Sequence, residues 1–171
     1  MLSFDTRALE SKAVQVEGDL AASDPVWAER DVRPTGAVHV EGRLSAAGEG
    51  RFYFSGHLSG EVALECRRCL TAVSSDVREN VHFLVAPEGD PTTEDDPDVF
   101  LFDAGTGQID LRPAIRESWL LAAPAFVQCR EDCKGLCPHC GTDLNVNACD
   151  CASTTDARWD ALQQARDQFH S

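Results

Sequence analysis

A cysteine-rich run near the C-terminal end constrains this chain more than any other feature. Six of its eight cysteines fall between residues 129 and 151, with the spacing C-x3-C-x3-C-x2-C-x8-C-x-C. In Cys137-Pro-His-Cys140-Gly141, the glycine allows a tight turn in which backbone N–H groups point at sulfur. The run predicts a zinc-knuckle module with four thiolate ligands and no open coordination position. Its ligands are Cys137, Cys140, Cys149 and Cys151.

A second C-x-x-C pair, Cys66 and Cys69, falls between two predicted strands, at the tip of a hairpin. Two sulfurs fill half of a tetrahedral site, and the late run holds two more cysteines than one site uses. We therefore expect one or two structural zinc ions, the second held by Cys66, Cys69, Cys129 and Cys133. Metal binding would then contribute to folding, by on the order of 10 kcal/mol per site.

Disulfides and redox catalysis are the competing interpretations of these cysteines. Acidic residues such as Asp5 and Glu10 interrupt the first apolar positions, so no signal segment is visible and a cytoplasmic location is expected. A thioredoxin-like C-x-x-C begins a helix, whereas Pro138 and Gly141 indicate a turn here. A thiol-based redox or zinc-responsive protein remains the alternative hypothesis. His139 remains a less favoured metal ligand.

Basic residues stand beside the proposed ligands. They are Arg67, Arg68, Arg130 and Lys134. A zinc ion with four thiolates carries a net charge of about −2, which these side chains would offset. The other interpretation is a small contact patch for RNA phosphate or for a partner protein.

The chain as a whole is acidic, with a formal net charge of −14 and a pI near 4.6. That balance argues against a protein that coats nucleic acid, because phosphate binding needs clustered Lys and Arg. It suits a basic partner such as a ribosomal protein, or solubility alone. No apolar run approaches the roughly 18 residues that indicate a membrane span, so no membrane partner is expected.

No catalytic constellation stands out, so we expect neither an enzyme nor a small-molecule substrate. A metal-assisted nuclease would need positioned carboxylates. The densest acidic segment, residues 87–98, reads as a solvated loop and lacks the spacing of a calcium site.

Hydrophobic alternation predicts an α+β fold: a mainly antiparallel β-sheet or partly open barrel, with one or two packed helices. We expect strands over residues 13–17, 37–45, 51–66, 71–85 and 99–102, with a bulge at Gly56 or Gly60. Asp110 is the expected N-cap of a helix ending near Ala123. The predicted domains are 1–126, a β plus helix domain that includes the acidic loop 87–98, and 127–171, the zinc-binding module with a C-terminal helix over 156–170.

Four segments together resemble the YceD family, the large ribosomal RNA subunit accumulation proteins of bacteria and plastids. They are LECRRCL, IDLRPAIRESWLLAAP, CREDCKGLCPHCGTDLN followed by C-x-C, and DARWDALQ. The similarity runs from about Gly36 onward, and CKGLCPHCGTDLN is its most specific part. The resemblance implies a non-enzymatic role in 23S rRNA accumulation and large-subunit biogenesis. We therefore expect a binding platform for a ribosomal protein or a large-subunit rRNA assembly intermediate, with no catalytic residues to assign.

Overall fold

An open five-stranded sheet forms the body of the computed structural model, which describes residues 2–90, 96, 98–151, 157–159, 162 and 166. Its strands, in spatial order, are β2 (Val14–Ala21), β3 (Ala37–Gly48), β4 (Arg51–Glu65), β5 (Ala72–Pro87) and β6 (Val99–Phe102). Strands β2 to β5 pair antiparallel, and β6 joins β5 in parallel. The expected α+β fold with a mainly antiparallel sheet is confirmed, and the sheet does not close into a barrel.

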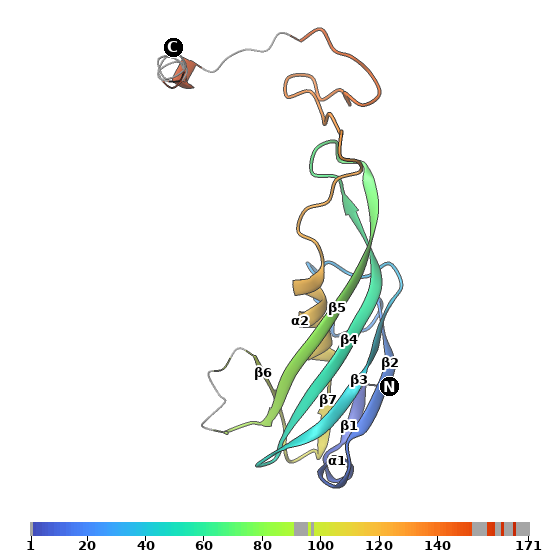
Figure 1. The fold of residues 1–171 in the computed structure, drawn as a ribbon, viewed down its shortest axis with the longest axis vertical. Coiled ribbons are helices and arrows are strands. Elements are labelled where there is room, and N and C mark those ends of the chain that lie inside the picture. Colours follow the sequence, from blue (N-terminus) through green and yellow to red (C-terminus); the bar gives the residue numbers. More distant parts are fainter. Residues whose placement is uncertain are drawn as a thin grey trace.

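Two short strands and a short helix, seen at the bottom of Figure 1, were not predicted. Strand β1 (Ser3–Asp5) pairs antiparallel with β7 (Gln108–Asp110), and helix α1 (Thr6–Ser11) follows β1 directly. The Asp5 carboxylate caps α1 by accepting hydrogen bonds from the backbone N–H groups of Arg7 and Ala8. Strands of three residues carry too little alternation to be recognised, because their stability depends on a partner far along the chain.

Helix α2 (Arg112–Ala122) packs its apolar stripe against the inner face of the sheet, as its spacing predicts. Trp119 is fully buried there and donates a hydrogen bond from Nε1 to the carbonyl of Val32 at 2.8 Å. The predicted N-cap is wrong: Asp110 ends β7 and Leu111 occupies the cap position without a side-chain hydrogen bond. Asp110 instead accepts from the backbone N–H of Arg112 at 3.0 Å.

Glycines allow two close approaches, one between strands β3 and β4 and one between the sheet and α2. Gly42 pairs with Gly56 across β3 and β4, where a Cβ on Gly56 would lie 2.2 Å from the carbonyl oxygen of Glu41. At Gly60, a Cβ would lie 2.9 Å from the Trp119 ring. The bulge expected at Gly56 or Gly60 is wrong, because the β4–β5 register continues through both, and the irregularity falls between Ala46 and Gly48. These glycines serve packing, not a break in pairing.

The β4–β5 hairpin runs past the other strands and carries the cysteine-rich segment at its far end (Figure 1). Two isolated bridges lie along this projection: Pro34 pairs with Val62 of β4, and Val127 pairs with Cys66, directly after β4. Among the described residues no helix is both long and apolar enough to cross a membrane. Most of the predicted C-terminal helix and residues 91–95 and 97 of the acidic loop lie outside the described residues.

Candidate metal centres

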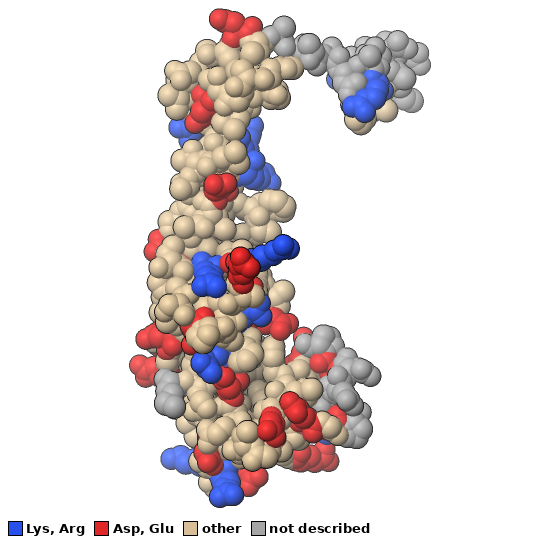
Figure 2. Space-filling model, turned by 180° about the vertical axis from the view of Figure 1, so that it is seen from behind, with Lys and Arg blue, Asp and Glu red and all other residues tan. Residues whose placement is uncertain are grey.

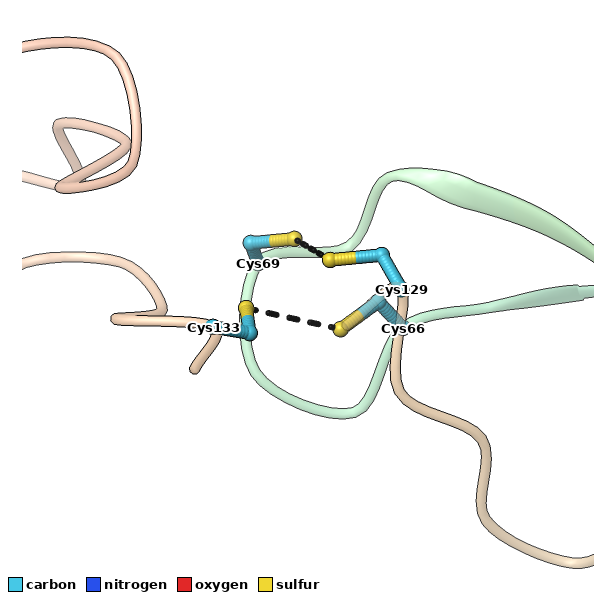
Figure 3. A group of neighbouring side chains, drawn as sticks. All are labelled: Cys66, Cys69, Cys129 and Cys133. Atoms are coloured by element: carbon cyan, nitrogen blue, oxygen red, sulfur yellow. Dashed lines mark hydrogen bonds between the residues drawn. The ribbon is translucent and has the colours of Figure 1, made fainter. Parts of the chain in front are cut away.

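The first cysteine group lies at the tip of the β4–β5 hairpin. Its four sulfurs all lie within 4.8 Å of one another (Figure 3), and they belong to Cys66, Cys69, Cys129 and Cys133. The Cys66 and Cys133 sulfurs are 3.8 Å apart, and those of Cys69 and Cys129 are 3.6 Å apart. All but Cys129 are buried.

Backbone hydrogen bonds hold the segment of residues 127–136, called the late segment below, against the hairpin tip. The N–H of Arg67 donates to the carbonyl of Val127 at 2.9 Å, and the N–H of Leu136 donates to the carbonyl of Arg68 at 2.9 Å. Between these contacts Gly135 adopts a φ of +77°, where a Cβ would lie 2.9 Å from the Arg68 carbonyl oxygen. A side chain at 135 would therefore meet both backbone strain and a steric clash.

The second group lies wholly within the cysteine-rich run. Its members are Cys137, Cys140, Cys149 and Cys151, with all four sulfurs within 4.8 Å of one another. Gly141 has a φ of +73° and donates its N–H to the carbonyl of Cys137 at 2.9 Å, which closes the expected tight turn. The backbone N–H of His139 donates to the Cys137 sulfur at 3.5 Å, while the His139 residue is exposed. Cys137 is buried, but Cys140 and Cys151 are exposed.

Asn145 joins the two groups, and the sequence analysis did not identify it. Its Oδ1 accepts from the backbone N–H of Lys134 at 2.7 Å and from the Arg130 guanidinium at 2.9 Å. Its Nδ2 donates to the Asp143 carboxylate at 2.7 Å and to the Cys133 sulfur at 3.5 Å. A residue that lies between ligands of the second group thus holds a ligand of the first.

The thiols of each group have divergent pKa values. Backbone N–H groups of Arg68 and Cys129 hold the pKa of Cys66 at about 6, against the opposing effect of burial. Burial, followed by the neighbouring thiols, raises the pKa of Cys129 to about 12. The Thr142 hydroxyl holds the pKa of Cys140 at about 6, and Cys140 in turn raises that of Cys151 to about 12. One thiolate disfavours the next, and a divalent cation among them would reverse that effect.

The donor set of both groups fits Zn²⁺. Four sulfurs converge in each, none of the eight is in a disulfide, and backbone N–H groups point at sulfur. Four thiolates complete a tetrahedral coordination shell, so each centre would be structural. The structure brings together the same two sets of four that the spacing suggests. That they bind metal stays a prediction.

The basic residues near the ligands are all exposed. They are Arg67, Arg68, Arg130 and Lys134. Arg130 contacts Asp132 at 3.3 Å, and Arg67 reaches the side-chain oxygen of Gln128 at 3.0 Å when that amide is turned toward it. Figure 2 shows both basic and acidic side chains at the narrow upper part of the molecule, whereas most of the acidic side chains on this face lie lower, with some basic ones among them.

Comparison with known proteins gives a family match over most of the chain. The model of "Large ribosomal RNA subunit accumulation protein YceD" matches residues 54–164. An uncharacterized protein of Mycobacterium leprae is 37% identical over 95 residues, covering 54% of this chain and 42% of that protein. Uncharacterized proteins of Mycobacterium bovis and Mycobacterium tuberculosis are 33% identical over 123 residues, covering 70% of this chain and 58% of theirs. The chain thus spans about half the length of these relatives. No solved structure matches.

Proposed function

Because the chain belongs to the YceD family of large ribosomal RNA subunit accumulation proteins, we propose that it is a non-enzymatic factor in large-subunit biogenesis. It supports 23S rRNA accumulation by acting as a binding platform for a ribosomal protein or for rRNA in an assembly intermediate. The observation that carries this proposal is the convergence of four sulfurs at the hairpin tip, where a metal with four thiolate ligands would have no open coordination position and would rigidify a binding end.

Two structural zinc ions give the platform its rigidity. The first would join Cys66 to Cys133, which are 67 positions apart in the sequence, and so fix the late segment on the hairpin tip. The second would fold the remaining loop, and Asn145 connects it to the first. The hairpin tip and the segment after α2 are joined by the backbone hydrogen bonds from Arg67 to Val127 and from Leu136 to Arg68. Metal binding would add much of the stability of this contact.

The distribution of charge supports different partners for the tip and for the body of the molecule. The acidic body repels phosphate, while the exposed Arg67, Arg68, Arg130 and Lys134 surround the tip. In this proposal these side chains contact rRNA phosphate, and the body faces protein. Contacts of this kind fix position without reading sequence, which suits a factor that recognises an assembly intermediate by shape.

The test is complementation of a deletion strain, read as ribosomal subunit profiles on a sucrose gradient. The deletion should lower the large subunit specifically, and the wild-type gene should restore it. A variant with Arg67→Ala and Arg68→Ala should restore it poorly. A control with Arg7→Ala and Arg43→Ala, which removes two exposed arginines from the body, should restore it fully. A normal profile in the deletion strain under all growth conditions would contradict the proposal.

A thiol-based, zinc-responsive function is the second candidate, favoured by the exposure of Cys140 and Cys151. In that case the exposed thiols would react before the metal leaves. The discriminating measurement is the rate of maleimide labelling beside the rate of zinc release, followed with a chromogenic chelator. Labelling that is fast and precedes zinc release favours the redox candidate. Labelling that follows zinc release favours a structural centre.

A further inference from the structure

Strand β5 has an open edge over much of its length. β6 pairs only with Leu84–Pro87, so the described part of the chain places no strand beside residues 72–83 on that side. The opposite edge of the hairpin is different, because β4 pairs there with β3 and is bridged further along by Pro34 at Val62. An open edge presents unpaired backbone N–H and C=O groups, which are a template for another extended segment.

A groove of about 290 Å³ runs between this edge and helix α2. Its lining comes from residues 79–82 of β5 and from Ser118, Leu121 and Ala122 of α2. A second hollow of about 80 Å³ shares His82, Ser118 and Leu121 and reaches Phe100 of β6. Leu121 is 81% exposed, the largest value among the exposed large hydrophobic residues that the structure describes. It presents an uncovered apolar side chain at the groove.

The charges along this groove are all of one sign. Glu79 lines the groove, Asp98 and Glu117 line the adjoining second hollow, and no lysine or arginine is among the residues that line either one. The arginines of α2 are engaged elsewhere: Arg112 pairs with Asp110, and Arg116 with Asp31. The groove therefore combines an apolar contact with a negative potential.

We propose that the β5 edge and the adjoining groove bind an extended basic peptide segment by strand addition. The segment pairs its backbone with β5, sets an apolar side chain against Leu121, and places arginine or lysine beside Glu79 and Glu117. This inference deepens the proposed function by naming the class of protein partner, and it rests on that function only for the cellular setting. RNA is the wrong chemistry for this surface, since phosphate would face Glu79 in the groove and Asp98 and Glu117 in the adjoining hollow.

The test uses the full zinc-loaded chain and a fluorescent peptide of alternating arginine and valine residues, with binding followed by anisotropy. Binding should weaken as salt is raised, because the charges are exposed. The double variant Leu121→Ser and Glu117→Lys should weaken binding by about tenfold or more, since it removes an apolar anchor and reverses a charge. A control with Leu101→Ser and Glu29→Lys makes the same changes at exposed sites outside the groove, and it should change affinity by less than about twofold.

Hydrogen exchange locates the peptide. Protection should rise in residues 72–83 of β5, and a peptide N-methylated at alternate positions, which cannot pair with a strand edge, should bind far more weakly. Protection elsewhere, equal binding of the N-methylated peptide, or tighter binding of oligouridine at this groove would overturn the proposal. Subunit profiles separate this result from the proposed function: a large-subunit deficit without peptide binding refutes the groove alone, and peptide binding with normal subunits refutes the function alone.

Discussion

The side-chain amide of Asn145 donates a hydrogen bond to the sulfur of Cys133 at 3.5 Å, while its oxygen accepts from the backbone N–H of Lys134 at 2.7 Å. One uncharged side chain therefore supports both a proposed zinc ligand and the chain beside it. Hydrogen bonds of this kind orient metal ligands and tune their charge. Asn145 lies between Cys140 and Cys149 in the sequence, so it links a ligand of the first group to the loop of the second.

Replacing Asn145 with alanine should weaken zinc binding at the first cysteine group more than at the second. The change leaves the Lys134 N–H without its acceptor, so we expect a loss of about 1–3 kcal/mol in the free energy of unfolding. Zinc release to a chelator should also become faster. The control is Asn147→Ala, since Asn147 is exposed and contributes a backbone hydrogen bond that alanine keeps. Equal release rates in the two variants would count against the coupling.

Single ligand substitutions should separate the two centres. Native mass spectrometry should find two zinc ions in the wild-type chain, and one ion in Cys66→Ser and in Cys140→Ser. The Cys66→Ser variant should also lose protection from hydrogen exchange at the hairpin tip, because Cys66 joins β4 to the late segment. In Cys140→Ser the sheet should unfold as in the wild type. One ion or none in the wild-type chain would contradict the two-site proposal.

The cross-strand pair of Gly42 and Gly56 gives a prediction about packing within the sheet. Gly56→Ala places a Cβ 2.2 Å from the Glu41 carbonyl oxygen, so β3 and β4 must separate locally. We expect a loss of about 1–3 kcal/mol in the free energy of unfolding, measured by urea denaturation. The matched control is Gly36→Ala, where a Cβ meets nothing within 4 Å, and its stability should stay near that of the wild type or rise slightly. A neutral Gly56→Ala would refute the close approach.

The ion pair between Asp31 and Arg116 predicts how stability depends on pH. The Asp31 side chain is 8% exposed, and its hydrogen bond to the Arg116 guanidinium lowers the pKa of its carboxyl below the ordinary value. Its stabilisation is therefore present above the pKa of the unfolded chain, about 3.9. It is lost as the pH falls below that value toward the lower pKa of the folded state.

Asp31→Asn should lower the free energy of unfolding by about 1–2 kcal/mol at neutral pH and reduce its decline in acid. Denaturation at several pH values checks both effects. Asp76→Asn, at an exposed position on the outer face of β5, should leave the acid decline in place. An unchanged decline in Asp31→Asn would show that other carboxylates control it.

The sequence predicted the parts of the fold that rest on local pattern. Alternation along β3 to β5 and the helical spacing around Trp119 identified the sheet and its covering helix, because one face of each must be buried. The spacing of cysteines suggested two sets of four for the same kind of reason: sulfur pairs that share a metal must be close. Residue-level features without a repeating pattern could not be predicted, and Asn145 is the clearest example.

Other features depend on where one element ends relative to another. Nothing in the sequence of β6 shows that it pairs in parallel and begins only opposite Leu84, yet that register leaves the preceding part of the β5 edge open. The short β1 strand likewise gains its partner only through β7, with Phe4 opposite Ile109. Such relationships arise from the assembled fold, so neither propensity nor periodicity reports them.

The contact of Cys66 with Cys133 also sets an order of events during synthesis. The hairpin leaves the ribosome first with only two sulfurs, and the proposed metal site could not be completed until the segment around Cys133 has followed. Until then the tip of the β4–β5 hairpin offers only two of the four proposed zinc ligands, Cys66 and Cys69. A nascent chain that is truncated or paused between these positions would display an open hairpin end, with the second cysteine group still to be made.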